Sequence, residues 1–200
     1  MKNFKINTLF FFTGLLIWTS PISAQNVLVE TEMGNIVLKL SPEKAPVTVN
    51  NFLKYVNAHR YDGAAFYRVV RMNNQADKKV KIEVIQGGLG DDSTKNFPRI
   101  KHESTNITGL KHKNGTLSMA RNIPGSAGSE FFICINDQPE LDFGGKRNPD
   151  GQGFAAFGEV VSGMEVVKKI QLSETGDAEE NQKLKFPVKI KSMQLIKNVK

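Results

Sequence analysis

The sequence is poor in the residues that staple small domains or bind metals. Its 200 residues include a single cysteine, Cys134, so no disulfide can form within the chain. The three histidines are widely spaced, and they do not combine with the cysteine into a zinc-binding pattern. We therefore expect no metal and no other cofactor. A chain of this length buries roughly 70% of its unfolded surface and needs no such staple.

Long hydrophobic runs are also scarce. The most apolar one, residues 9–18, is too short for a membrane-spanning helix, which needs about 20 residues. Lys2 and Lys5 precede it, and a small residue, Ala24, follows a few positions after it. This three-part pattern is typical of a secretory signal. We interpret residues 1–24 as a cleaved signal peptide rather than a retained membrane anchor.

The excess of basic over acidic residues is modest. There are 27 basic and 20 acidic residues, which gives a net charge of +7. The densest basic run, residues 78–81, is interpreted as a solvated loop, so we expect no nucleic-acid partner. Residues 25–200 are expected to form one domain that is periplasmic or secreted. We expect a monomer with no stable membrane insertion after signal cleavage.

Short β-type runs separated by turn residues dominate the remaining sequence. Helical spacing of apolar residues occurs at 47–58 and again near 166–170. The stretch 91–114 is irregular and polar, and its length predicts a functional or locally structured segment. The absence of regular βαβ alternation favours an all-β fold, a closed eight-stranded antiparallel barrel capped by two helices. The predicted strands are 27–31, 36–40, 66–70, 82–85, 117–120, 131–135, 154–161, 188–190 and 193–196.

Three segments could carry chemistry. Arg68 lies within an apolar strand, where its charge must be paired, exposed or functional; alternatively its stem covers apolar surface while its head reaches water. The glycines at 87–88 indicate backbone that turns tightly or approaches another group closely. Phe131 and Phe132 are adjacent on a strand, so one ring is expected in the core and the other on the outer face.

Seven motifs in order make the sequence resemble the cyclophilin family of peptidyl-prolyl cis-trans isomerases. The resemblance runs from about residue 27 to 196. It implies the same capped eight-stranded barrel, and an enzyme that accelerates Xaa-Pro rotation in exported polypeptides and so assists protein folding. The motifs are Met-Gly-Asn-Ile (33–36), Ala-Pro-x-Thr-Val-x-Asn-Phe (45–52), Phe-x-Arg-Val-Val (66–70), Gln-Gly-Gly (86–88), Gly-Thr-Leu-Ser-Met-Ala (115–120), Gly-Ser-x-Phe-Phe-Ile (128–133) and Phe-Gly-x-Val-x-x-Gly (157–163).

The resemblance also implies a site on the outer wall of the barrel that binds proline-containing polypeptides. It assigns Arg68 as the catalytic arginine and Gln86 as a holder of the substrate backbone. The other substrate-binding residues that it implies are Val84, Ala120, Arg121, Glu130, Phe132, Leu141 and Phe154. Among these, Phe132, Leu141 and Val84 would form the walls of the proline pocket.

The sequence departs from the family at several site positions. Glutamate stands at position 130, where the family usually has glutamine. Glu83 stands where an aromatic residue is expected, and Glu140 occupies a rim position that is an aromatic residue or a histidine in the family. The segment 71–81 is much longer than the family's short turn. These acidic residues motivate an alternative, a proline-binding module or chaperone with little turnover. A generic barrel that binds ligands in a hollow interior is a third hypothesis.

A specific expectation follows for position 130. If Glu130 lies beside Arg68, the two should form a charge-assisted pair that orients the guanidinium. Such a pair would favour the ionised carboxylate and lower the pKa of Glu130.

Overall fold

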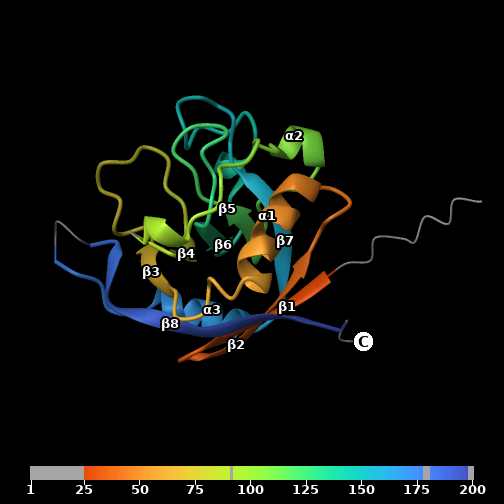
Figure 1. Ribbon diagram of the computed structural model, residues 1–200. Coiled ribbons are helices and arrows are strands. Elements are labelled where there is room, and N and C mark those ends of the chain that lie inside the picture. Colours follow the sequence, from red (N-terminus) through yellow and green to blue (C-terminus); the bar gives the residue numbers. More distant parts are fainter. Residues whose placement is uncertain (1–24, 91, 178–180, 198–200) are drawn as a thin grey trace, which may run out of the picture.

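Eight antiparallel strands close into a barrel in the computed structural model (Figure 1), in the order β1-β2-β7-β5-β6-β4-β3-β8. The structure describes residues 25–90, 92–177 and 181–197, so the predicted signal peptide at 1–24 lies outside the described residues. The predicted fold class is confirmed. The strands are β1 Gln25–Thr31, β2 Gly34–Leu40, β3 Ala65–Val70, β4 Val84–Gly88, β5 Thr116–Met119, β6 Phe131–Cys134, β7 Ala155–Ser162 and β8 Lys183–Ile196. The two runs predicted at the end of the chain are one continuous strand, β8.

Two helices of the described chain cap the barrel, as predicted. The first, α1 (Pro46–Asn57), contacts β7 and β8, whereas α3 (Met164–Gln171) contacts β2, β3 and β4. A third helix, α2 (Thr105–Thr108), is one turn long and lies in the stretch predicted to be irregular or locally structured. Short 3₁₀ turns occur at Ser93–Lys95 and Pro139–Leu141. No helix in the described ranges is both long and apolar enough to cross a membrane.

The stretch 91–114 is fixed to the barrel through a buried carboxylate. Glu103 accepts hydrogen bonds from the backbone N–H groups of Val47 and Thr48 at 3.1 and 2.8 Å, and from the Thr48 hydroxyl at 2.7 Å. These N–H groups belong to the first turn of α1, which has no side-chain cap of its own. A negative charge at a helix N-terminus is favourable because it satisfies free donors and complements the helix dipole.

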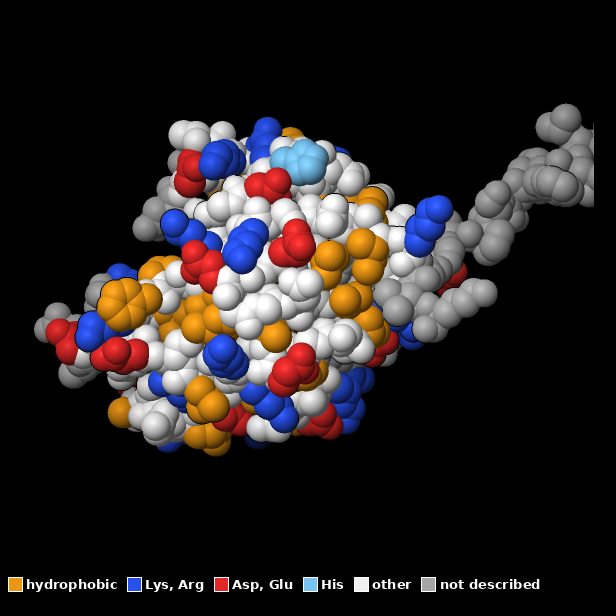
Figure 2. Space-filling view, turned by 90° about the horizontal axis from the view of Figure 1, so that it is seen from below, with side chains coloured by type: hydrophobic (Ala, Val, Ile, Leu, Met, Phe, Trp, Pro, Cys, Tyr) orange, Lys and Arg blue, Asp and Glu red, His pale blue; other side chains and the backbone are white. Residues whose placement is uncertain are grey.

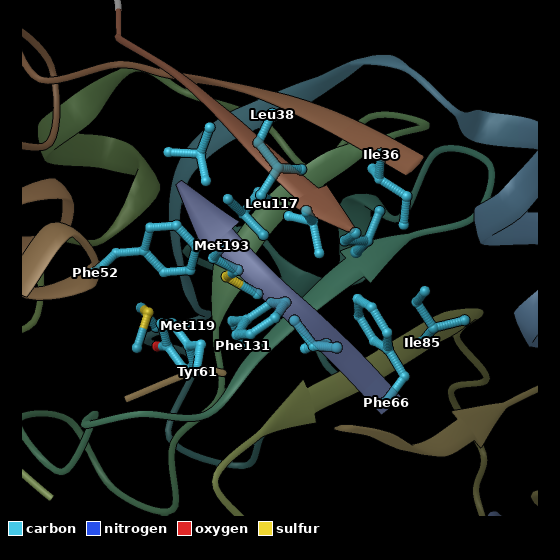
Figure 3. Close-up of a cluster of buried hydrophobic side chains, with 14 of the residues drawn as sticks. Ile36, Leu38, Phe52, Tyr61, Phe66, Ile85, Leu117, Met119, Phe131 and Met193 are labelled. Atoms are coloured by element: carbon cyan, nitrogen blue, oxygen red, sulfur yellow. The ribbon is translucent and has the colours of Figure 1, made fainter. Parts of the chain in front are cut away.

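Aromatic rings fill the interior of the barrel (Figure 3). Phe52, Tyr61, Phe66, Phe131 and Phe157 are all fully buried. The ring of Phe52, which enters from α1, lies 5.2 to 5.6 Å from the rings of Tyr61, Phe131 and Phe157, centroid to centroid. The hypothesis of a hollow, ligand-binding interior is therefore wrong.

Strand register places the predicted site residues on the outer wall. Arg68 of β3 pairs with Gln86 of β4, and Gln86 pairs with Phe132 of β6. Directly paired residues present their side chains on the same face of a sheet. Phe131 packs in the interior cluster and Phe132 in a separate outer cluster, so the expectation of one ring on each face is confirmed.

The surface that faces downward in Figure 1 carries charges of both signs (Figure 2). Acidic and basic side chains are interspersed there, with hydrophobic side chains between them. Nζ of Lys185, on β8, lies 2.9 Å from Oε1 of Glu174, and Nζ of Lys39, on β2, lies 3.9 Å from Oε1 of Glu159. These pairs are exposed, so they contribute little to stability.

Candidate active site

A cavity of about 430 Å³ opens on the outer wall of the barrel. All nine residues predicted from the sequence line it, although they come from six separate segments of the chain. They are Arg68, Val84, Gln86, Ala120, Arg121, Glu130, Phe132, Leu141 and Phe154. The sequence analysis missed the other lining residues, which are Ile82, Arg99, Asn122, Ser126, Gly128, Arg147 and Asn148.

The floor of the cavity is apolar. Val84, Phe132 and Leu141 belong to one buried cluster, and Ala120 and Phe154 pack against it from more exposed positions. The rings of Phe132 and Phe154 meet edge to face, with centroids 5.3 Å apart. An uncharged, saturated ring such as that of proline suits such a floor because it makes no demand for hydrogen bonds.

A buried polar chain supports this floor from behind. The imidazole of His112 stacks on Phe132 with centroids 6.0 Å apart, and its two nitrogens lie 2.8 Å from Asp142 Oδ1 and 2.9 Å from Ser118 Oγ. The order serine, histidine, aspartate matches that of hydrolytic triads. However, Ser118 is fully buried, so no substrate carbonyl can reach its hydroxyl. These hydrogen-bonded side chains fix the imidazole of His112, which packs against the ring of Phe132.

The guanidinium of Arg68 is held from two sides. Its Nη1 donates to Oε1 of Gln86 at 2.8 Å, while Nε and Nη2 both donate to Oε1 of Gln182, at 3.1 and 2.5 Å. An arginine has five N–H donors, so two remain available for a bound molecule. Burial lowers the pKa of Arg68, but an arginine stays charged at neutral pH.

Gln86, which holds Arg68 on one side, is itself the first member of a relay of hydrogen bonds. Gln86 Nε2 donates to the hydroxyl of Tyr67 at 2.8 Å, and that hydroxyl donates to Oε2 of Glu130 at 2.5 Å. An ionised carboxylate only accepts, so the Tyr67 hydroxyl must point toward Glu130 and accept from Gln86. This order fixes the Gln86 amide with its oxygen toward Arg68. The burial of Tyr67 and its bond to Glu130 raise the pKa of the phenol.

The expected ion pair between Glu130 and Arg68 is wrong. The carboxylate of Glu130 instead accepts from Tyr67, from Ser129 Oγ at 3.0 Å and from the Gly90 backbone N–H at 3.0 Å. Burial raises the pKa of Glu130, and these hydrogen bonds only partly oppose the rise, so the expected lowering of its pKa is also wrong. The desolvation of the carboxylate therefore outweighs the hydrogen bonds that favour its ionised form.

The glycines at 87–88 are explained by close approach. A Cβ atom on Gly88, whose φ is +148°, would lie 2.6 Å from Oε1 of Glu130. A Cβ atom on Gly87 would lie 2.8 Å from the ring of Phe66. Gly88 therefore makes room for the carboxylate, and Gly87 lets β4 lie against the core.

The other two acidic departures lie away from the cavity lining. Glu83 accepts a hydrogen bond from the Asn136 amide at 2.9 Å, and Glu140 accepts one from the Lys146 backbone N–H at 2.7 Å. Neither belongs to the residues that line the cavity. Among the described residues that line the cavity, Glu130 is therefore the only acidic one.

Arg121 lines the cavity and is held in place by several contacts. Its guanidinium forms a two-pronged pair with Asp150 at 2.7 and 2.9 Å and lies 5.2 Å from the centre of the Phe154 ring. Nε donates to the Gly153 carbonyl at 2.8 Å. Arg121 lowers the pKa of Asp150 to about 2. These contacts indicate that Arg121 fastens the 150–154 segment to the end of β5.

The site has a charged donor, a backbone-binding amide and an apolar floor. No group of three or more potential metal ligands occurs among the described residues. Such a wall can bind and polarise a polypeptide segment that contains an apolar ring. Such a site is typical of proteins that change the conformation of a bound polypeptide without breaking a covalent bond.

Comparison with known proteins names the family. The model described as "Cyclophilin type peptidyl-prolyl cis-trans isomerase/CLD" matches residues 26–195. Peptidyl-prolyl cis-trans isomerase A of Dickeya dadantii is 38% identical over 179 residues, which cover 88% of this chain and 86% of that protein. Peptidyl-prolyl cis-trans isomerase B of Escherichia coli is 40% identical over 154 residues, which cover 75% of this chain and 86% of that protein.

A solved structure agrees on the fold. The crystal structure of a cyclophilin type isomerase from Cryptosporidium parvum superimposes with a TM-score of 0.70 at 22% identity, covering 88% of this chain and all of that one. The chain belongs to the cyclophilin family and is a peptidyl-prolyl cis-trans isomerase.

Proposed function

We propose that this isomerase acts on Xaa-Pro bonds of exported polypeptides and assists their folding, with Arg68 as the catalytic residue. The observation that carries the catalytic role is the placement of the Arg68 guanidinium. It lines the same cavity as the apolar floor and keeps two donors for a bound chain.

Rotation about a peptide bond costs about 18–20 kcal/mol because the nitrogen lone pair is delocalised into the carbonyl. Xaa-Pro bonds isomerise in about 10–100 s without help. In our proposal the floor of Phe132, Leu141 and Val84 grips the proline ring, Gln86 holds the adjoining backbone and Ala120 and Arg121 flank the chain. No nucleophile or general base is required because no bond is broken.

Arg68 would act as the bond twists. The proline nitrogen then becomes pyramidal and regains its lone pair, so it becomes a better acceptor than in either planar state. A guanidinium donor aimed at it stabilises the twisted state more than the substrate, which lowers the barrier. The charge-assisted character of this hydrogen bond and the half-buried position of Arg68 strengthen the effect.

A protease-coupled assay on an Xaa-Pro peptide tests the catalytic role. We expect Arg68→Ala to keep the wild-type circular dichroism spectrum and to lose about 10²–10³-fold in kcat/KM, comparable to the loss of one oxyanion donor. Arg68→Lys should also be poor, since an ammonium lacks the planar fork. Wild-type turnover by Arg68→Ala would contradict the proposal, and unfolding would assign Arg68 a structural role.

The exported location rests on the signal-like sequence of residues 1–24. Expression in a bacterium with two membranes, followed by fractionation and intact-mass measurement, tests it. The expected product is periplasmic, begins at Gln25 and lacks tryptophan, because Trp18 is the only one in the chain. A cytoplasmic product that retains residues 1–24 would contradict this location.

A further inference from the structure

We propose that the segment 71–81 is a positioning device for Arg68, and that it acts through Gln182. The inference deepens the proposed function and rests on it, because a positioned guanidinium matters only if Arg68 is catalytic. It assigns a role to a segment that is longer than the turn expected in the family.

Gln182 can hold Arg68 in only one orientation of its amide. Its Oε1 accepts from Arg68 Nε and Nη2, and its Nε2 donates to the Asn74 backbone carbonyl at 2.9 Å. A guanidinium only donates and a carbonyl only accepts, so a flipped amide would lose every one of these bonds. The Gln182 backbone carbonyl also accepts from the Val69 N–H at 2.8 Å, which places it beside Arg68.

Asn74 joins Gln182 to the start of the segment. Its side-chain amide donates to the backbone carbonyls of Val69 at 3.1 Å and Asn181 at 3.0 Å, and its Oδ1 accepts from the Arg71 backbone N–H at 2.7 Å. The Asn74 side chain is 8% exposed. One residue therefore ties together the end of β3, the segment and the approach to β8.

Gln75 closes the neck of the segment. Its Nε2 donates to the carbonyls of Arg71 at 2.7 Å and Ile82 at 2.8 Å, and the residue is 1% exposed. Arg147 adds a second clamp by donating from Nη1 to Gln75 Oε1 at 2.8 Å and to the Val80 carbonyl at 2.6 Å. Buried and fully bonded amides make this segment a fixed part of the wall.

Holding Arg68 in this way has a kinetic consequence. A free arginine side chain must lose rotamer entropy to adopt one geometry. The two glutamines impose that geometry before substrate binds, so the donors already point toward the twisted bond. The contribution should therefore appear mainly in kcat, while the apolar floor continues to set KM.

Gln182→Ala removes both acceptor contacts with Arg68. We expect kcat to fall roughly tenfold, the scale of losing charge-assisted hydrogen bonds, with little change in KM. Asn74→Ala should lower kcat in the same direction by a smaller factor, because the Asn74 backbone carbonyl remains. Gln194→Ala is the matched control, since Gln194 is an exposed residue of β8 far along the strand. It should match the wild-type protein.

The decisive comparison repeats Gln182→Ala in an Arg68→Ala background. If Gln182 acts through Arg68, its substitution has no further effect there. An equal loss of kcat in both backgrounds, or no loss in either, would overturn the positioning role. Failure of the proposed function is distinguishable from this, because it would appear as full activity of Arg68→Ala alone.

A measurement on the unaltered protein covers the case in which Gln182→Ala does not fold. Arginine Nε–H signals can be followed by NMR, and the Arg68 signal is assigned by its loss in Arg68→Ala. We expect its exchange with solvent to be slower than that of the exposed Arg99. Exchange as fast as that of Arg99 would show that the guanidinium is not held.

Discussion

The two sides that hold Arg68 are built differently. On one side Gln86, Tyr67 and Glu130 form a relay of hydrogen bonds across the barrel wall, and the relay ends on a half-buried carboxylate. On the other side Gln182 connects Arg68 to a backbone carbonyl of the 71–81 segment. The first side is built from strand pairing alone, whereas the second adds to the pairing of β3 with β8 a hydrogen bond to the irregular 71–81 segment.

The difference separates what is general in this barrel from what is particular to the chain. Register brings Gln86 opposite Arg68 wherever β3 and β4 pair in this way. Pairing of β3 with β8 brings Gln182 next to Arg68, since Lys183 pairs with Arg68, but the contact of its amide with the Asn74 carbonyl exists only because of the 71–81 segment. The barrel side should therefore be the more costly to break, and the loop side the more open to variation.

Breaking the barrel side at its first member should have the largest effect. Gln86→Leu removes the acceptor for Nη1 of Arg68 and the amide proposed to bind the substrate backbone. We expect kcat/KM to fall by about 10²-fold, since one substitution removes both a positioning contact and a binding contact. The protease-coupled assay measures it, and a loss smaller than that of Gln182→Ala would reverse the ranking of the two sides.

Tyr67→Phe interrupts the relay one step further from Arg68. The change removes the hydroxyl that accepts from Gln86 and donates to Glu130, so the Gln86 amide loses its preferred orientation. We expect a loss of roughly fivefold in kcat/KM, the scale of one neutral hydrogen bond. Thermal unfolding should be measured in parallel. Wild-type turnover in a folded Tyr67→Phe protein would show that the relay does not orient Gln86.

Glu130→Gln sharpens the comparison at the end of the relay and should change activity least. The amide oxygen can still accept from Tyr67, and Arg68 is not released because Glu130 does not touch it. We expect kcat/KM within about twofold of wild type, well below the effect of a lost hydrogen bond network. A tenfold gain would contradict this expectation and show that the carboxylate hinders catalysis.

The same variant makes a prediction about stability and pH. Burial raises the pKa of Glu130, so the folded protein binds a proton at this carboxylate more tightly than the unfolded chain does. Its stabilising contribution is complete below the ordinary pKa and is lost as the pH rises through the raised value. The free energy of unfolding of wild type relative to Glu130→Gln should therefore decrease between about pH 4 and pH 7. Urea unfolding at both pH values measures it, and an increase would contradict the sign.

Sequence reasoning predicted most of the barrel and the residues of one wall. Alternating apolar residues and turn glycines were sufficient to predict the strands. The residues of the wall were predicted from the seven motifs that resemble the family. The neighbours of Glu130 could not be predicted from the sequence. Arg68 and Tyr67 are consecutive residues of β3, and the sequence alone does not show which of the two side chains Glu130 contacts. Tyr67 itself gave no signal beyond its place in a strand.

The loop side was beyond prediction for a physical reason. Gln182 lies just before β8, and Asn74 and Gln75 lie in the segment 71–81, which is longer than the turn expected in the family. The contact between them joins residues more than one hundred positions apart, from the side-chain amide of Gln182 to the backbone carbonyl of Asn74. No periodicity marks such a pair, since the bond depends on the path of the 71–81 segment.

The central claim is that both sides act through one guanidinium, and a combined variant tests it most directly. Tyr67→Phe and Gln182→Ala are introduced together, in the wild-type and in the Arg68→Ala protein, and kcat and KM are measured on one Xaa-Pro peptide. We predict that kcat falls by up to about fiftyfold in the wild-type background, and that it falls no further in the Arg68→Ala background, where the part of the effect that Gln86 exerts on substrate binding remains in KM. A similar loss in both backgrounds would contradict the account.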